Sequence, residues 1–339
     1  PIASIDRTAK MYIGGKQARP DSGYSLPIYS AKGDVIGEVG HGNRKDIRNA
    51  VEAARKATGW TATSAHNRAQ VLYYLAENLD IRAQEFADRI SLQTGVSAKK
   101  ATEEVEAAVQ RLFTYGAWAD KYESRVHNPP MRGVTLAMKE AIGTIGIICP
   151  DENPVLGMIS LAAPAIAMGN RVVLVPSEQH PLSATDFYQI LETSDVPVGV
   201  LNIVTGLQSE LTKPLAEHDD VKSVWYMEDE DGSALVEKSS IGNMKRTWTN
   251  HGKKRDWFNK EQAEGEEFLD LPADQPGRHL LARRAQQHRG HVEAEAGDED
   301  QHRAIGDARR GQRQVDMAEQ RQAIGPHALG RANERAVDL

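Results

Sequence analysis

Two short apolar runs decide the fold: the chain reads IGTIGIIC at residues 142–149 and RVVLV at residues 171–175. Each run is rich in β-branched residues and precedes a segment of helical length and pattern, at 155–168 and 181–193. The alternation continues at 200–204 with 208–217, and at 222–227 with 232–240. Continuous apolar strands between helices are typical of a parallel sheet covered on both faces. We therefore predict an α/β fold with a doubly wound parallel sheet of the nucleotide-binding type.

The residues before this region predict further strands and helices. Short strands broken by glycine turns are expected at 11–16 and 24–40, and a helix at 46–57. A longer helix starts near Ser64, and its apolar stripe continues to Ile90 at a spacing of three and four residues. A third helix places Val105 and Leu112 on one face, with Glu103, Glu104 and Arg111 elsewhere. Residues 1–268 are thus predicted to form one folded domain.

The composition changes after Phe268, the last aromatic residue. Residues 269–339 contain eleven Arg, no Lys and five His. A segment with so little to bury does not offset the entropy of ordering its backbone, which predicts a disordered, low-complexity tail. Arg without Lys, together with Ala, Gly and His, is also what GC-rich DNA yields in an unselected frame. An out-of-frame tail that truncates the domain near Asp270 is therefore an equal alternative.

Composition excludes several classes of function. The chain has 339 residues, a net charge of −7 and one cysteine. A mildly acidic protein lacks the basic stripe of a nucleic-acid binder. A single cysteine excludes a disulfide framework and fits a reducing compartment, so we expect a cytoplasmic location. The longest uncharged stretch, 153–170, is shorter than the roughly 20 apolar residues that span a membrane, so no membrane association is expected.

No metal site is expected. The tail places two histidines close to two glutamates, which chance composition explains better than metal binding; these residues are His288, His291, Glu293 and Glu295.

Several segments, in order along the chain, resemble the aldehyde dehydrogenase superfamily. They are its opening strand (11–16), its first long helix and Thr-Gly turn (67–95), the strand before a Pro-Trp-Asn-Phe-Pro turn (142–154), its core helix and Lys-Pro-Ser-Glu strand (163–178), and a Pro-x-Gly-Val-x-Asn-x-Val-x-Gly strand (197–206). The resemblance covers about residues 10–260 and implies a Rossmann-like domain of the NAD-binding type. Residues 225–226 and 242–252 resemble, more narrowly, the degenerate C-terminal half of tandem family-sixteen proteins.

The resemblance implies oxidation of aldehydes to carboxylic acids through a cysteine thiolate, but the nucleophile position is not matched. In the family it lies a few tens of residues beyond Lys253, which falls in the tail, where this chain has no cysteine. Cys149 lies at the end of a predicted strand, where the family has no nucleophile, and we interpret it as a packed core thiol.

The other two catalytic positions are degenerate as well. The asparagine that stabilises the oxyanion corresponds to Glu152, whose charge opposes an oxyanion. Asn153, one step along, is expected to point elsewhere. The base glutamate corresponds to Thr249, which takes up no proton near neutral pH. His251 beside it carries an imidazole, a type of side chain that can act as a base, but it has no orienting partner in the sequence, so we interpret it as structural.

The resemblance implies NAD or NADP as cofactor and carries its site onto Cys149, Pro150, Pro176, Ser177, Glu178, Gly206 and Gly232. The lysine of the Lys-Pro-Ser-Glu strand is Val175 here, and the run before Gly232 is acidic, Glu-Asp-Glu-Asp at 228–231. A carboxylate and a phosphate ~4 Å apart repel by about 4 kcal/mol at a dielectric of 20. A helix dipole attracts an anion by only ~0.3–1 kcal/mol. We therefore expect the acidic run to stabilise its own helix and to disfavour the cofactor.

Three functional hypotheses follow. The first is an active NAD(P)-dependent aldehyde oxidoreductase, and the second, which we favour, is a catalytically silent pseudoenzyme with a structural or assembly role. The third is a truncated product without a function of its own. Residues 122–134 resemble the crossover into the family's oligomerisation hairpin, which implies such a hairpin at 124–140 with an interface strand at 134–139. The expected partners are therefore a second copy of the chain or a catalytic aldehyde dehydrogenase subunit.

Overall fold

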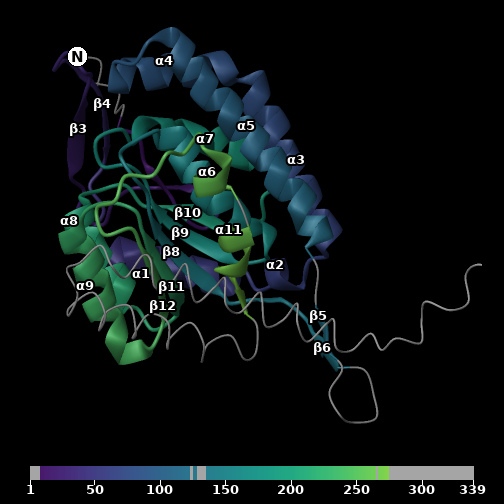
Figure 1. Ribbon diagram of the computed structural model, residues 1–339. Coiled ribbons are helices and arrows are strands. Elements are labelled where there is room, and N and C mark those ends of the chain that lie inside the picture. The colour runs from purple at the N-terminus through teal and green to yellow at the C-terminus, as the bar shows by residue number, and fades with distance from the viewer. Residues whose placement is uncertain (1–7, 123–124, 128–134, 265, 275–339) are drawn as a thin grey trace, which may run out of the picture. The chain divides into compact units, whose positions relative to one another are not determined.

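The computed structural model describes residues 8–122, 125–127, 135–264 and 266–274. Within these residues a seven-stranded sheet runs in the order β12-β11-β8-β9-β10-β1-β2 (Figure 1). Its parallel strands are β8 (Thr144–Ile148), β9 (Arg171–Val175), β10 (Leu201–Ile203), β11 (Val221–Tyr226) and β12 (Arg246–Thr249). The short strands β1 (Met11–Tyr12) and β2 (Gln17–Ala18) complete one edge in antiparallel pairing. The predicted α/β class with a doubly wound sheet is confirmed.

Helices cover both faces of this sheet because successive strand residues point to opposite sides. On β8, Ile147 packs in the core beneath α6 (Pro154–Ala167) and α7 (Leu182–Thr193). The next residue, Ile148, packs in a second core beneath α1 (Arg44–Lys56), α8 (Gln208–Glu217) and α9 (Glu230–Ser240). The strand order reverses between β8 and β11, so the topological switch point lies at their carboxyl ends, where ligands bind in such sheets.

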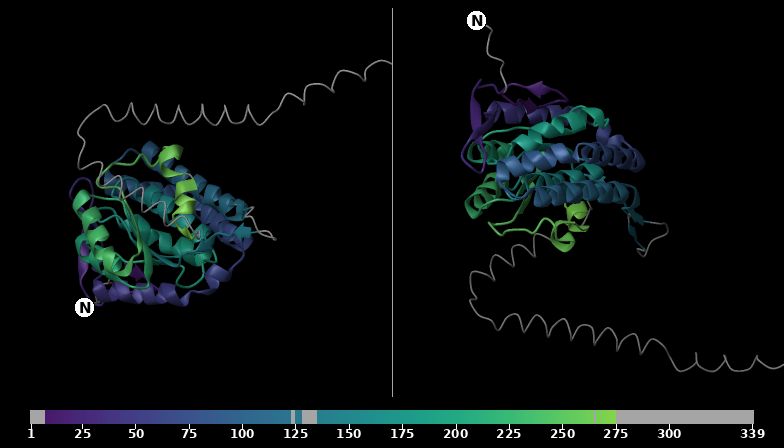
Figure 2. Two further views of the ribbon diagram at one scale, coloured as in Figure 1. Left: turned by 60° about the horizontal axis from the view of Figure 1, so that its bottom comes forward. Right: turned by 90° about the horizontal axis from the view of Figure 1, so that it is seen from above.

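An outer helical layer packs over α6 and α7. It consists of α3 (Ala65–Ile81), α4 (Ala83–Thr94) and α5 (Ala98–Lys121), which lie side by side in Figure 2. The helix predicted to run from Ser64 to Ile90 is divided at Arg82. The division directs α4 toward α7, where the Phe86 and Phe187 rings meet edge to face at 6.3 Å. None of the described helices is long and apolar enough to cross a membrane.

The remaining elements are short. A hairpin pairs β3 (Ser25–Tyr29) with β4 (Val35–Gly40), and a second antiparallel pair joins β5 (Arg125–His127) to β6 (Thr135–Ala137). The second pair falls within the 124–140 segment predicted as a hairpin. The short helices are α2 (Gly59–Ala62), η1 (Ile241–Asn243), α10 (Lys260–Ala263) and α11 (Glu266–Asp270).

The packed domain extends beyond the boundary predicted at residue 268. Leu269 in α11 is fully buried, and β13 (Ala273–Asp274) pairs with β7 (Glu140–Ala141). The Phe268 ring meets Trp248 edge to face at 4.9 Å. The boundary was wrong because a segment without aromatic residues still supplies apolar side chains that continue the core. Residues 275–339, including the His/Glu group of the tail, lie outside the described residues.

Candidate functional site

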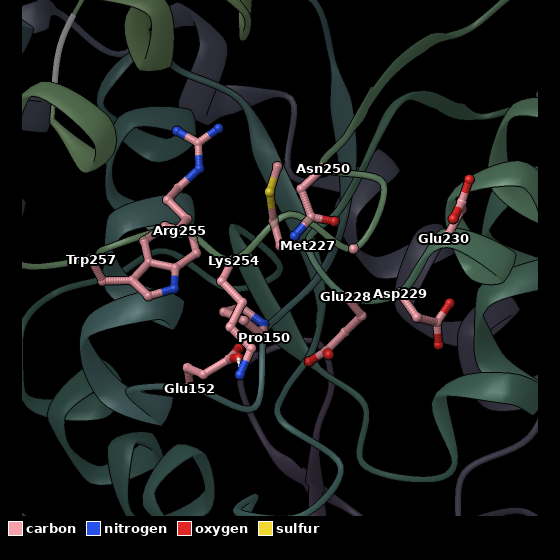
Figure 3. Close-up of a pocket in the computed structure, with 11 residues that line it drawn as sticks. Pro150, Glu152, Met227, Glu228, Asp229, Glu230, Asn250, Lys254, Arg255 and Trp257 are labelled. Carbon is pink, nitrogen blue, oxygen red and sulfur yellow. Dashed lines mark ion pairs between the residues drawn. The ribbon is translucent and has the colours of Figure 1, made fainter.

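A cavity of about 240 Å³ opens at the carboxyl ends of β8, β11 and β12. Pro150 and Glu152 line it from the end of β8, residues 227–230 from the end of β11, and residues 250–257 in part from beyond β12 (Figure 3). This is the switch point of the sheet, where ligands bind in such folds. Of the predicted site residues, Pro150 and Glu152 reach the cavity lining.

The charge of the cavity is predominantly acidic. Lys254 forms an exposed ion pair with Glu152 at 3.2 Å, which neutralises one carboxylate. Arg255 points away from Glu228 in Figure 3, and its guanidinium lies 5.2 Å from the centre of the Trp248 ring. The carboxylates of residues 228–230 are therefore not balanced by these two cations.

Glu228 is the most perturbed of these acids. Its Oε1 atom is buried without a hydrogen-bond partner among the described residues. Burial, and then the charges of Asp151 and Glu152, raise its pKa to about 8. Figure 3 shows its carboxyl directed toward Pro150 and Glu152. At neutral pH this group is therefore largely protonated, and a nearby anion would raise its pKa further.

Cys149 is fully buried at the end of β8 and does not line the cavity. Its backbone N–H donates to the carbonyl of Val175 at 2.9 Å, which extends the pairing of β8 with β9. Burial raises the pKa of its thiol well above the usual value, and the charge of Glu228 adds to the effect. The protonated, enclosed sulfur is a poor nucleophile.

The side chains of Glu152 and Asn153, in the turn after Cys149, point to different partners and do not converge in the cavity. Asn153 adopts a left-handed conformation with φ 50°, and its amide donates to Glu104 Oε2 at 3.3 Å. Glu152 extends toward Lys254 instead. Neither residue presents a neutral donor into the cavity.

Glu104 is a functional contact that the sequence analysis missed. We expected it outside the apolar face of its helix, but only 3% of its surface is exposed. Its Oε1 accepts hydrogen bonds from the N–H groups of Val155 (3.0 Å) and Leu156 (3.3 Å), so it caps α6 from α5. Burial raises its pKa, and these hydrogen bonds oppose the rise. The interpretation was wrong because the buried face of α5 is wider than the predicted apolar stripe: Glu104 and Arg111 lie four and three residues from the buried Ala108, beside that stripe.

Arg111, also expected outside the buried face of α5, is likewise 3% exposed. Its guanidinium donates to the carbonyl of Trp257 at 3.0 Å and to the Ser160 hydroxyl at 2.8 Å, and it also bonds the carbonyl of Ala263. An ion pair with Glu264 at 3.3 Å completes the set. Through these contacts, Arg111 holds the segment that follows β12 against α5 and α6.

Thr249 and His251 lie together beside α9. His251 Nε2 lies 3.1 Å from Glu237 Oε1 and 3.1 Å from the Thr249 hydroxyl, which itself donates to Glu237 at 3.0 Å. Glu237 is the orienting partner that the sequence analysis did not find for His251. Neither Thr249 nor His251 lines the cavity, and the structure does not bring them together with Glu152.

The predicted cofactor residues after β9 are engaged within the protein. The Ser177 hydroxyl donates to Asp151 Oδ1 at 2.6 Å, and Glu178 Oε2 accepts from the backbone N–H of Gln208 at 2.6 Å. The Gln208 side chain donates in turn to the carbonyls of Cys149 (3.0 Å) and Pro176 (3.3 Å). Gln208 thus crosses the carboxyl ends of β8 and β9.

Gly206 lies just before α8, and Gly232 lies in the first turn of α9. Gly206 has φ 151°, a conformation that favours glycine, in the turn into α8. A Cβ on Gly232 would lie 2.0 Å from the Tyr226 hydroxyl oxygen, so a side chain does not fit there. The N–H of Gly232 donates to Asp229 Oδ1 at 2.6 Å. The acidic run thus caps α9, as the sequence suggested.

Comparison with known proteins identifies the family. The model of the aldehyde dehydrogenase family matches residues 21–270, most of the chain. The chain belongs to the aldehyde dehydrogenase family. This agrees with the nucleotide-binding type of sheet and with the motifs that resemble the superfamily.

The alignments with named relatives show what share of a family member's length this chain covers. The chain is 34% identical over 218 residues to hydroxyisobutyraldehyde dehydrogenase of Mycolicibacterium austroafricanum, which covers 64% of this chain and 43% of that protein. It is 30% identical over 280 residues to aldehyde dehydrogenase family 2 member B4 of Arabidopsis thaliana. This match covers 80% of this chain and 51% of that protein. The chain therefore spans about half the length of the aldehyde dehydrogenases that it matches.

Solved structures agree in fold. A putative aldehyde dehydrogenase from Burkholderia cenocepacia superposes with a TM-score of 0.71 at 27% identity, over 73% of this chain and 51% of that one. The betaine aldehyde dehydrogenase of Staphylococcus aureus, solved in complex with NAD+, superposes with a TM-score of 0.70 at 23% identity. The superposition covers 73% of this chain and 50% of that chain. The second similarity shows the fold alone.

Proposed function

We propose that this chain is a catalytically silent member of the aldehyde dehydrogenase family with a structural or assembly role. One observation carries the proposal: the single cysteine of the sequence is enclosed beneath the end of β8, outside the cavity. Aldehyde oxidation by the family's route needs a thiolate within reach of the substrate carbonyl. A buried thiol with a raised pKa supplies neither the charge nor the access.

The surroundings of the cavity support the same proposal. Glu152 places a carboxylate paired with Lys254 where a neutral donor would stabilise the developing oxyanion, and a carboxylate donates no hydrogen bond to it. Thr249 in the position of the base glutamate takes up no proton near neutral pH.

One feature favours the alternative of an active NAD(P)-dependent oxidoreductase. His251 has Glu237 as an orienting carboxylate at 3.1 Å, an arrangement typical of a general base. A base without a nucleophile in reach completes no acyl transfer, so we rank this alternative second. The exposed position of all three groups fits a surface hydrogen-bond cluster equally well.

The assembly role rests on the β5–β6 pair. Val126 on β5 is 72% exposed and Met138 beside β6 is 62% exposed, which leaves apolar surface available for a partner. We propose that this hairpin joins a second copy of the chain or a catalytic aldehyde dehydrogenase subunit in the cytoplasm. A relationship to the degenerate half of the tandem family-sixteen proteins would account for such a role and belongs to the same proposal.

An activity assay tests the proposal directly. Purified protein is incubated with short aliphatic and aromatic aldehydes and with NAD or NADP, and absorbance at the reduced-cofactor band is followed. We expect no aldehyde-dependent reduction. Turnover that is lost in C149A and kept in the matched variant E77Q, an exposed helix position, would refute catalytic silence.

An association assay tests the role. The chain is co-expressed with a catalytic aldehyde dehydrogenase subunit, and the complex is sized by native mass spectrometry. We expect a homo-oligomer or a mixed oligomer that V126D weakens, because an exposed apolar residue of the hairpin becomes charged. A monomer that binds neither partner would support the third hypothesis, a product without function.

A further inference from the structure

We propose that carboxylates of the chain itself occupy the N-termini of α8 and α9 at the carboxyl end of the sheet, so that this end of the sheet excludes the diphosphate of a dinucleotide. The proposal rests on the proposed function, because a silent domain needs no cofactor. Helix N-termini bind anions through free backbone N–H groups and the positive end of the helix dipole. At this end of the sheet, one such N–H of α8 and one of α9 already donate to a carboxylate of the chain.

The first occupied terminus is that of α9, an eleven-residue helix that starts beside the end of β11. Asp229 Oδ1 accepts the N–H of Gly232 at 2.6 Å and lies 3.3 Å from the Tyr226 hydroxyl. Its backbone carbonyl also accepts from the Ser233 hydroxyl at 2.8 Å. A phosphate oxygen would have to displace this carboxylate to reach the same amide.

The second occupied terminus is that of α8, a ten-residue helix. Glu178 Oε2 accepts the N–H of Gln208 at 2.6 Å, although Glu178 lies after β9, thirty positions earlier. The Gln208 side chain then spans the carbonyls of Cys149 and Pro176, which closes the space between α8 and the sheet. The two capped helices start on either side of the end of β8.

Glu228 lines the cavity beside Asp229 and adds to the exclusion. Figure 3 shows its carboxyl directed toward Pro150 and Glu152, and Asp229 and Glu230 line the same cavity, so a diphosphate placed here would meet several acidic groups at once. One carboxylate about 4 Å from a phosphate lowers affinity on the order of several hundredfold at an effective dielectric of 20. The Lys254 ammonium is already paired with Glu152 and compensates little of this.

The test measures binding of ADP-ribose and of inorganic pyrophosphate by titration calorimetry. Neither ligand carries nicotinamide, so binding is measured independently of any oxidation. The wild-type chain is compared with the triple variant E178Q/E228Q/D229N. These substitutions keep the size of each side chain and one acceptor oxygen. They remove the negative charges of Glu178 and Asp229 and the titratable proton of Glu228, which is largely protonated at neutral pH. Asparagine is a good helix N-cap. A second version of the triple variant carries D229G in place of D229N, which removes the side-chain acceptor of the Gly232 N–H.

The matched control is D34N/E77Q/D231N. It substitutes the same number of carboxyl groups at exposed positions and removes at least as much negative charge at neutral pH, and Asp231 lies in the first turn of α9 itself. None of its three carboxylates accepts a helix N-terminal N–H in the described structure. Thermal unfolding of all variants checks that each is folded before titration.

We expect no measurable binding to the wild type at millimolar ligand, and a gain of about tenfold or more in the triple variant over the control, as removal of close repulsion predicts. D229G should increase the gain further. Micromolar binding of ADP-ribose by the wild type, no gain in the triple variant, or an equal gain in the control would each overturn the proposal. Turnover of aldehydes would refute the proposed function separately, so the two failures are distinguishable.

Discussion

Glu228→Gln should make the protein more stable at high pH, although it changes one side-chain group at the edge of a cavity. The pKa of Glu228 is raised from 4.5 to about 8, first by burial and then by the charge of Asp151. The folded state therefore binds more protons than the unfolded state between these two values. Because of that difference, the free energy of unfolding falls as pH rises from about 4.5 to 8.

The size of the effect follows from the shift. Each pKa unit corresponds to about 1.4 kcal/mol, so a fully buried group with this shift would cost about 5 kcal/mol above pH 8. The side chain is only partly buried, and solvent screening reduces the expected cost to about 2 kcal/mol. Glutamine has the same size, keeps an acceptor oxygen and never ionises.

Urea denaturation at pH 5, 7 and 9 measures this prediction. We expect E228Q to match the wild type within about 0.5 kcal/mol at pH 5 and to exceed it by about 2 kcal/mol at pH 9. The control E77Q, at an exposed position of α3, should show no such trend. A difference between E228Q and wild type that stays constant across this range would refute the assignment of a raised pKa to Glu228.

Three further predictions concern buried groups. Arg111→Met leaves the carbonyl of Trp257 without its donor and should lower the free energy of unfolding by about 3–5 kcal/mol, with faster proteolysis of residues 253–264; unchanged proteolysis would contradict it. The Cys149 thiol should resist a disulfide reagent at pH 8 in the native state and react at once in urea, and rapid native reaction would show that it is accessible. Glu104→Ala should cost about 1–3 kcal/mol by removing the cap of α6, whereas Glu103→Ala on the exposed side should cost less than about 0.5 kcal/mol, as thermal unfolding would report.

Buried charges connect the segment that follows β12 to the rest of the described domain. Arg111 connects α5 and α6 to the segment that follows β12, and Lys139 and Asp270 form an ion pair between the strand region before β7 and α11. Breaking a buried pair leaves an uncompensated charge, which costs more than the pair itself contributes. These contacts fix the position of the chain after β12 relative to the sheet.

The sequence determined the central strands and the family. The runs at 144–148 and 171–175 are apolar at nearly every position because both faces of these strands are buried, so no alternation was needed to recognise them. The cap of α9 could also be predicted from the sequence, because Asp229 is the residue directly before the helix. Local chemistry sufficed in both cases.

Only the tertiary structure decided which groups satisfy the N-termini of α6, α7 and α8. Glu104 caps α6 from α5, Gln93 accepts the N–H of Leu182 at the start of α7 at 2.8 Å, and Glu178 caps α8 from the end of β9. Asn153, the residue that sequence rules favour as cap of α6, makes no capping bond. Hydrogen bonding depends on atoms meeting within about 3 Å, and residues distant along the chain meet only after the layers pack, so the composition of each segment does not encode these partners.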